Sequence, residues 1–151
     1  MSVVVREGTI FDVPFMVAVG KMMHEESDFA SFNWNNEKTT RFADRAVSDP
    51  DFCTFIVEVD GEPVGMIIGK VSPFFFGDAL QLHDYLWYVA PEHRGASAGA
   101  KLIAAYVEFG KAKGVQQVSI KISTNVTTGK TGKLLEKLNF VHVGGMFKFK
   151  V

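Results

Sequence analysis

The pattern of hydrophobic and polar positions along the 151 residues predicts a chain in which strands and helices alternate. Short apolar or alternating runs are typical of β-strands, and such runs cover residues 3–6, 52–59, 63–71, 80–89, 115–122, 140–143 and 146–151. Apolar residues recur at helical spacing in four other segments, at about residues 12–25, 37–47, 97–113 and 131–138. The predicted order is therefore β-α-α-β-β-β-α-β-α-β-β.

The order and the turns predict how the strands are arranged. Asp60-Gly61 separates two strand-like runs and is a strong hairpin signal, so the strands between residues 52 and 89 should form an antiparallel meander. The passage from the strand at 80–89 through a helix to the strand at 115–122 should be a parallel, right-handed crossover. We therefore expect an α/β fold with a mixed, mostly antiparallel sheet of six to seven strands. Four helices should cover both faces of this sheet, in a single domain that spans residues 1–151.

Composition narrows the classes of protein. Hydrophobic residues make up 47% of the chain and charged residues 22%, as in globular domains. The net charge of −1 lacks the basic surplus of a nucleic-acid binder, so no nucleic-acid partner is expected. The single Cys53 excludes an internal disulfide and a multi-cysteine zinc site, and no metal is expected. The chain shows no signal peptide and no apolar run long enough for a bilayer, so we expect a soluble, cytoplasmic protein without a membrane partner.

The most informative segment begins at the end of the fourth predicted strand. The apolar run 86–89 stops at Pro91, a charged turn follows, and residues 95–100 are all very small. These small residues fall where the third helix begins. The first backbone N–H groups of a helix lack intrahelical partners, and the helix dipole makes that end positive. Small side chains leave these groups accessible, so the sequence predicts a phosphate-binding site.

The same segment, Val89-x-Pro91-Glu92-x-Arg94-Gly95-x3-Gly99-x2-Leu102, strongly resembles the acetyl-CoA signature of the GNAT-type N-acetyltransferases. The predicted order of elements is similar to the fold of that family along essentially the whole chain. A second match is the run 134–140 with the following Val143-Gly144-Gly145, which resembles the closing helix and strand of the family. The resemblance implies acetyl-CoA as the cofactor and direct transfer of its acetyl group to a primary amine.

The resemblance also implies which residues bind the cofactor. In the family, the loop after the fourth strand and the first turn of the next helix wrap the pyrophosphate, which here gives Arg94, Gly95, Ala96, Ser97, Ala98, Gly99 and Ala100. The end of the fourth strand should bind the pantetheine arm through Trp87, Tyr88 and Val89, and the arm should also contact Asn125 or Thr128. Gly99 has a second interpretation, as a site where the helix packs closely on the sheet.

Two positions depart from the family pattern. Ser97 stands where the family has a glycine, although serine is small and its hydroxyl can also bind a phosphate. Leu135 stands where the family often has a tyrosine that protonates the departing thiolate. Tyr88 or Tyr106 can substitute for that acid, or the thiolate can leave unassisted because the pKa of a thiol is about 8.5. These departures keep open a second function, that of a non-catalytic CoA-binding regulatory module.

The acceptor amine must lose a proton before it attacks the thioester, because the pKa of a lysine-like amine is about 10.4. His83 and Asp84 on the fourth strand are the best candidates for the base, with His24 as a third. His83 and Asp84 are adjacent in a strand, so only one of them can face the cofactor cleft. The alternative is that one faces solvent and the other is a satisfied polar group. The resemblance places the donor for the oxyanion at a backbone N–H near Tyr88 or Val89.

The resemblance places the acceptor near the first two helices and the loop before the fourth strand. That region supplies the candidate acceptor-binding residues Glu25, Phe29, Phe32, Trp34 and Phe75. Acidic and aromatic side chains together suit a cationic amine, carried by either a small molecule or a peptide. A solvated loop with buried anchors is the alternative interpretation of the same residues.

The last run, at 146–151, alternates Phe147, Phe149 and Val151 with two lysines, which predicts a strand with one buried face. Dimerisation through the terminal strands is common in the family. The apolar face can therefore be buried either in a homodimer or in the core of a single chain, and the sequence leaves both alternatives open.

One further motif indicates a different function. Residues 124–131 resemble a phosphate-binding Walker A loop in which Thr124 replaces the first glycine. That glycine allows the loop to wrap around the phosphate, and no acidic strand motif for magnesium is evident. The sequence therefore favours acetyl-CoA over a nucleoside triphosphate as the ligand.

Overall fold

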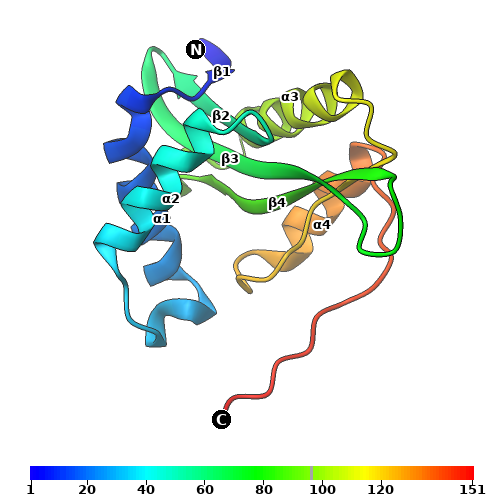
Figure 1. Cartoon of the computed structure of the whole chain (residues 1–151). Helices are drawn as coiled ribbons and strands as arrows, with labels where there is room; N and C mark the ends of the chain where they lie inside the picture. The colour runs from blue at the N-terminus through cyan, green and yellow to red at the C-terminus, as the bar shows by residue number, and fades with distance from the viewer. Residues whose placement is uncertain (96) are drawn as a thin grey trace.

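The chain folds as a mixed α/β protein, shown in a computed structural model that describes residues 1–95 and 97–151 (Figure 1). The sheet has five strands, β1 (Val3–Glu7), β2 (Phe52–Val59), β3 (Glu62–Pro73), β4 (Leu80–Val89) and β5 (Gln117–Ser119). The α-helices are α1 (Val13–Glu26), α2 (Asn36–Ser48), α3 (Ala98–Ala112) and α4 (Thr128–Lys137). Three short 3₁₀ turns are η1 (Ile10–Asp12), η2 (Asp28–Ser31) and η3 (Pro91–His93). None of the described helices is both long and apolar enough to cross a membrane.

The strands follow one another across the sheet in the order β1-β2-β3-β4-β5. Neighbours from β1 to β4 are antiparallel, whereas β4 and β5 are parallel. The β2–β3 hairpin closes through Asp60 and Gly61, with φ angles of 51° and 85°, because a tight two-residue hairpin turn needs positive φ at both positions. The predicted meander and the parallel pairing of β4 with β5 are confirmed.

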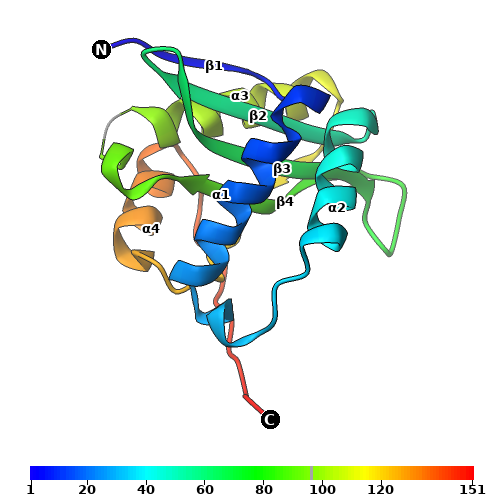
Figure 2. The same ribbon diagram turned by 90° about the vertical axis from the view of Figure 1, so that its left-hand side faces the viewer.

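Helices cover both faces of the sheet, α1 and α2 on one and α3 on the other (Figures 1 and 2). Leu102 and Tyr106 of α3 are fully buried in the core on their side of the sheet. Met16 of α1 packs with Ile56 of β2 in a second core on the opposite side. The short helix α4 contributes its buried Leu135 to the α3-side core, so α4 is held close to α3.

A β-bulge interrupts β4 near its middle. Ile68 of β3 pairs with Leu86, but the next residue, Gly69, pairs with Asp84, so Tyr85 has no partner of its own. The extra residue shifts the alternation of side chains, which decides the face that each later residue of β4 occupies. After the bulge, Trp87 and Val89 pack on the α3 side, whereas Leu86 and Tyr88 pack on the side of α1 and α2.

The pattern of hydrophobic and polar positions did not predict this bulge. Its one signal is Gly69, which lies directly opposite the bulge. A β-carbon at Gly69 would lie 2.5 Å from the ring of Tyr106 and 2.9 Å from the carbonyl oxygen of His83. Glycine is therefore required here for the close approach of α3 and of the bulged strand.

The prediction of six to seven strands is wrong, because the last two predicted strands do not form. β5 covers three residues instead of the predicted 115–122. Its edge for pairing with a further strand is therefore correspondingly short. After α4 the chain turns at Asn139, with a φ of 68°, and residues 141–151 continue without a strand partner among the residues that the structure describes. Of the two alternatives for the last run, the single chain rules out burial in its own core, since Phe147 and Phe149 are 98% and 91% exposed. Alternation specified which side chains share a face, but it did not specify a neighbouring strand.

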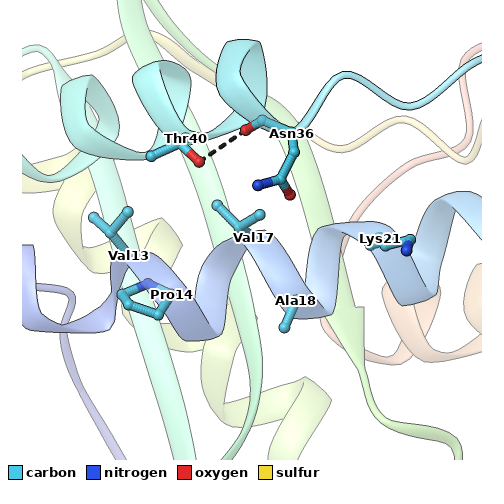
Figure 3. A pocket seen from close by; sticks show the side chains of 7 residues that line it. All are labelled: Val13, Pro14, Val17, Ala18, Lys21, Asn36 and Thr40. Carbon is cyan, nitrogen blue, oxygen red and sulfur yellow. Dashed lines mark hydrogen bonds between the residues drawn. The ribbon is translucent and has the colours of Figure 1, made fainter.

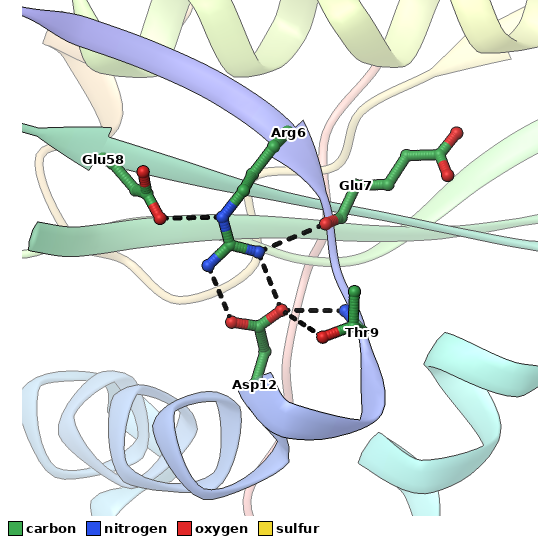
Figure 4. A network of polar contacts seen from close by, with 5 residues as sticks. All are labelled: Arg6, Glu7, Thr9, Asp12 and Glu58. Carbon is green, nitrogen blue, oxygen red and sulfur yellow. Dashed lines mark hydrogen bonds and ion pairs between the residues drawn. The ribbon is translucent and has the colours of Figure 1, made fainter. Parts of the chain in front are cut away.

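An ion-pair network fixes the start of α1 against the sheet (Figure 4). Arg6 of β1 donates to both carboxylate oxygens of Asp12, each at 2.9 Å, and to Glu58 of β2 at 2.7 Å. Asp12 also accepts the backbone N–H of Thr9 at 2.8 Å, which closes η1. The hydrogen bond from Arg6 is the main cause that lowers the pKa of Asp12. Through Arg6, Asp12 therefore connects the start of the first helix to two strands.

Candidate functional site

The edge of β4 that faces β5 is open over much of its length. β5 pairs only with Gln81–His83, and in the described part of the chain residues 84–89 have no strand partner on that side. The backbone N–H of Lys121 crosses the gap to donate to the carboxylate of Asp84 at 3.0 Å. Backbone groups of a strand require hydrogen-bond partners, so an extended ligand can complete the edge of β4 here.

The open edge of β4 leads into the N-terminus of α3. Gly95 has a φ of 86°, a left-handed conformation that glycine adopts without strain. Ser97 precedes the helix without a side-chain capping hydrogen bond. Among the described residues we find no acceptor for the first N–H groups of the helix, those of Ala98, Gly99 and Ala100. This end of α3 is suited to bind an anion, as the sequence predicted.

Trp87 packs beside the first turn of α3. A β-carbon at Gly99 would lie 3.4 Å from the indole, an ordinary contact, so packing alone does not require a glycine there. The indole Nε1 of Trp87 is buried, and no described group accepts its hydrogen bond. Ala96, which the resemblance also assigns to this loop, lies outside the described residues.

The side chain of Arg94 is bound within the protein. Its guanidinium donates to both carboxylate oxygens of Glu26, at 2.8 Å for the Nη2–Oε2 pair, and to the carbonyl of Val89 at 2.8 Å. It also lies 4.9 Å from the centre of the Tyr88 ring. These hydrogen bonds raise the pKa of Arg94 and lower the pKa of Glu26. This Glu26–Arg94 clasp joins the end of α1 to the loop before α3.

The tyrosines that were considered as acids both donate their hydroxyl protons to other groups. Tyr88 donates to Glu26 at 2.6 Å, and burial, followed by that hydrogen bond, raises the pKa of Tyr88 to about 12. Tyr106 is fully buried and donates to the carbonyl of Ser119 at 3.1 Å. Leu135, at the position of the usual acid, is buried against α3. The described residues at these positions therefore offer no free acid.

His83 and Asp84 have different surroundings, as expected for neighbours on a strand. Asp84 is buried and accepts the N–H of Lys121, and burial is the main cause that raises its pKa. His83 is half-buried, with its ring 5.6 Å from that of Tyr85, which stacks on Phe52 of the core below α1 and α2. Burial is also the main cause that lowers the pKa of His83 below 6.5. The imidazole is therefore mostly neutral at neutral pH and able to accept a proton.

The residues predicted to bind the acceptor lie in several places. Trp34 packs on α1, with its ring 5.3 Å from that of His24, and neither ring nitrogen of His24 has a described partner. Phe29 is half-buried in η2, whereas Phe32 is 60% exposed. The remaining two predicted residues are both exposed, namely Glu25 near Lys21 and Phe75 in the β3–β4 loop.

The segment after β5 approaches η2. Asp28 donates its backbone N–H to the carbonyl of Thr124 at 3.2 Å, so the turn after α1 and the loop before α4 are in contact. Asn125, with a φ of 59°, lies in that loop, and Thr128 is the first residue of α4. Thr127 precedes the helix without a side-chain capping hydrogen bond.

A separate groove of about 430 Å³ lies between α1 and α2 (Figure 3). Its lining consists of Val13, Pro14, Val17, Ala18, Lys21, Asn36 and Thr40, and Thr40 donates to the carbonyl of Asn36 at 2.8 Å. None of the predicted site residues lines this groove. It is therefore distinct from the open edge of β4 and the start of α3.

Comparison with known proteins identifies the family. Residues 19–140, most of the chain, match the family model described as "Acetyltransferase (GNAT) family". The chain belongs to the GNAT acetyltransferase family. The resemblance found in the sequence is therefore confirmed, and the open edge of β4 beside the uncapped α3 is part of a GNAT domain.

Solved structures share the GNAT fold along nearly the whole chain. An aminoglycoside acetyltransferase from an uncultured soil metagenomic sample is 19% identical, with a TM-score of 0.74 and coverage of 100% of this chain and 99% of that chain. The aminoglycoside acetyltransferase AAC(6')-Iy, bound to a bisubstrate analogue that contains CoA, is 15% identical, with a TM-score of 0.78 and coverage of 100% and 99%.

A ribosomal-protein-alanine N-acetyltransferase from Brucella melitensis is also 15% identical, with a TM-score of 0.73 and coverage of 99% of both chains. No curated protein matched the sequence. These relatives differ in the acceptors that their names state, so the shared fold does not identify an acceptor for this chain.

Proposed function

We propose that the protein is an acetyl-CoA-dependent N-acetyltransferase that transfers an acetyl group directly to a primary amine. The observation that carries the proposal is the continuous path from the open edge of β4 to the uncapped N-terminus of α3. An extended, polar arm can hydrogen-bond to the strand edge, while a pyrophosphate can bind the helix N–H groups. Acetyl-CoA has both parts in this order, and structures of the family relative AAC(6')-Iy contain CoA or an analogue.

The described residues fit this cofactor. The N–H groups of Ala98, Gly99 and Ala100 would hold the pyrophosphate, with Gly95 and Ser97 shaping the loop. Tyr88 and Val89 on the open side of β4, together with Asn125 and Thr128 across the gap, would hold the pantetheine arm. Because the Glu26–Arg94 clasp occupies the guanidinium, Arg94 would set the conformation of this loop while the backbone binds the phosphates.

We assign the general base to His83 in preference to Asp84. His83 lies on the side of the sheet covered by α1 and α2, where the acceptor is expected, and its lowered pKa keeps it neutral. Asp84 is buried towards α3, and its carboxylate is already bonded to Lys121. The neutral amine would attack the thioester carbonyl, and a backbone N–H near Tyr88 or Val89 would stabilise the oxyanion. The thiolate would leave without an acid, since a thiol pKa of about 8.5 makes it an adequate leaving group.

The acceptor would be a cationic primary amine of a small molecule or a peptide. Glu25, Phe29, Phe32 and Trp34 lie around the end of α1 and the turn that follows it, where acidic and aromatic groups favour a positive charge. The named acceptors of the relatives, aminoglycosides and a ribosomal protein, are consistent with this class.

The second candidate is a non-catalytic CoA-binding module. It is favoured by the buried Leu135 at the acid position and by the two tyrosine hydroxyls that already donate to Glu26 and to a carbonyl. Such a module would bind CoA tightly and would release no CoA from acetyl-CoA in the presence of an amine.

Ligand-dependent thermal shift followed by an acetyl-transfer assay tests the proposal. We expect CoA and acetyl-CoA to raise the melting temperature, since a ligand that binds only the folded state stabilises it, and ATP with magnesium to have no effect. With acetyl-CoA we expect thiol release on addition of aminoglycosides, lysine peptides or peptides with an N-terminal alanine. A shift with ATP alone would favour the Walker-like loop, and binding of acetyl-CoA without transfer to any amine would favour the non-catalytic module.

We also propose that the exposed tail forms a homodimer contact. Residues 141–151 extend away from α4, no described strand pairs with them, and alternate apolar side chains of this segment are exposed. An extended segment with unpaired backbone groups and apolar side chains can pair with a second copy.

A further inference from the structure

The C-terminal tail returns to the protein through one side chain, Lys148. Its ammonium donates to the carbonyl of Ser123 at 2.6 Å, lies 4.0 Å from the carboxylate of Asp28 and lies 4.5 Å from the centre of the Phe29 ring. A carbonyl, a carboxylate and an aromatic face are the three kinds of group that bind an ammonium ion. Asp28, Phe29 and Ser123 therefore form a cation site, and a primary amine of the chain itself occupies it.

The cation site lies between the two halves of the proposed active site. Asp28 and Phe29 belong to η2, in the region where the acceptor is expected. Ser123 belongs to the loop after β5, two positions before Asn125, which we expect to contact the pantetheine arm. The hydrogen bond from Asp28 to Thr124 holds these two segments together. An amine in this site is thus near both the acceptor-binding turn and the cofactor-binding loop.

In the described part of the chain, Lys148 is the one residue of the tail that makes polar contacts with the rest of the protein. Every residue from 141 to 151 is exposed to solvent. Within the residues that the structure describes, each hydrogen bond, ion pair and cation–π contact made by this segment involves Lys148. Side chains alternate along an extended chain, so when Lys148 faces the site, Phe147 and Phe149 face away from it. Lys150 lies only two residues further along, and among the described residues its side chain makes no hydrogen bond, ion pair or cation–π contact.

We propose that the Asp28–Phe29–Ser123 cation site is the amine-binding subsite for the acceptor and that Lys148 is itself acetylated there, in cis. This proposal rests on the acetyltransferase function proposed above. It also defines the acceptor chemically, as a primary ammonium at the end of a flexible alkyl chain.

The reaction at Lys148 balances without any further reactant. After losing a proton to the base, Nζ attacks the thioester carbonyl of acetyl-CoA, so that an N–C bond forms and the C–S bond breaks. CoA leaves with the electron pair as a thiolate, and a second proton is lost from nitrogen to solvent or to the thiolate. The product is a neutral amide, which no longer pairs with Asp28 or with the Phe29 ring. The acetylated side chain therefore leaves the site after a single turnover.

Peptide mass spectrometry on the purified full chain, after incubation with acetyl-CoA, tests the proposal. Acetylation of Lys148 should be at least about tenfold faster than that of Lys150, because a bound amine reacts at a high effective concentration. The rate constant should not depend on protein concentration, since the tail contacts its own chain. Incubation with CoA in place of acetyl-CoA should leave both lysines unmodified.

Two variants test the cation site and a third is their control. Lys148→Arg keeps the charge but removes the reactive amine, and it should abolish the fast modification. Asp28→Asn keeps the backbone bond to Thr124 but removes the ion pair, and it should slow Lys148 acetylation severalfold while acetyl-CoA binding is kept. Lys150→Arg should leave the acetylation of Lys148 unchanged.

The outcomes separate this inference from the proposed function. A chain that binds acetyl-CoA and acetylates an added lysine peptide, yet modifies Lys148 and Lys150 equally or neither of them, overturns the inference alone. A rate constant that rises with protein concentration overturns acetylation in cis. Absence of acetyl-CoA binding overturns the proposed function and this inference together.

Discussion

His83 and Asp84 are adjacent on β4, but their surroundings give them different chemistry. The side chain of His83 is half-buried and has no hydrogen-bond partner among the described residues, whereas Asp84 is buried and accepts a hydrogen bond from Lys121. We expect His83→Gln to lower kcat/KM by about 10²–10⁴-fold, the usual contribution of a general base. Asp84→Asn is the matched control, because an amide oxygen can still accept the N–H of Lys121, and its kcat/KM should stay close to that of the unmodified protein.

The pH–rate profile provides the decisive measurement for this pair. Burial lowers the pKa of His83 from 6.5, so the active, neutral imidazole persists to a pH below that value. Activity should therefore be lost only as the pH falls below about 6.5, the ordinary range of histidine, and this limb should vanish in His83→Gln. A limb that survives in His83→Gln but disappears in Asp84→Asn would assign the base to Asp84.

At the residue scale, the sequence could indicate positions but not partners. The pattern singled out the small residues at the start of α3 as a candidate phosphate site, and His83 and Asp84 on β4 as candidate bases. It did not predict Glu26 as the partner of Arg94, because 68 positions separate the two residues and no local pattern connects them. The sequence likewise offered Tyr88 and Tyr106 equally as the acid that protonates the thiolate. In the structure each hydroxyl donates to another group.

At the scale of elements, the attachment of α1 to the sheet depends on the ionised form of Asp12. The folded protein lowers the pKa of Asp12 from 3.8, so this contribution to stability is present above the unfolded pKa and is lost as the pH falls through the folded pKa. We expect the free energy of unfolding to decrease as the pH drops below about 4, the carboxylate range. Urea unfolding at a series of pH values measures this dependence.

Asp12→Asn separates this network from the other carboxylates. The variant should lose about 1.5–3 kcal/mol at neutral pH, the range for hydrogen bonds to charged groups, with the lower end favoured because Arg6 is 37% exposed. Its stability should also depend less on pH in the acidic range. Glu37→Gln removes a fully surface-exposed pair with Arg41 and should change little, and an equal loss in both variants would contradict a specific role for Asp12.

Most elements could be predicted because each carries a local signal. The Asp60-Gly61 turn fixed the β2–β3 hairpin, and helical spacing placed α1, α2 and α3 close to their observed ends. The bulge at Tyr85 was not predictable in this way, because it depends on the fit of Gly69 against Tyr106 on a distant helix. The missing terminal strands show the same limit, since alternation is a property of one segment and pairing is a property of two.

At the scale of the whole molecule, the exposed tail predicts self-association. Phe147, Phe149 and Val151 are almost fully exposed in the single chain. Alternation along an extended segment puts them on the face opposite Lys148. Burial of such side chains is worth about 1.5–3 kcal/mol each, so a contact between two tails would be favourable. We expect sedimentation velocity to show a monomer–dimer equilibrium that shifts toward the dimer as concentration rises.

The double variant Phe147→Ser with Phe149→Ser should be monomeric at concentrations where the unmodified chain is dimeric. Its melting temperature, measured where both proteins are monomeric, should be unchanged, because neither ring packs against its own chain. Phe11→Ser is the matched control, since Phe11 is 91% exposed on η1, far from the tail in sequence, and its removal should leave the dimer intact.

A double variant that still dimerises would place the contact on another surface, whereas loss of the dimer in Phe11→Ser alone would place it beside η1. If the dimer and the Lys148 contact both form, the two faces of one extended segment have separate partners, the aromatic face a second copy and the lysine face the acceptor site.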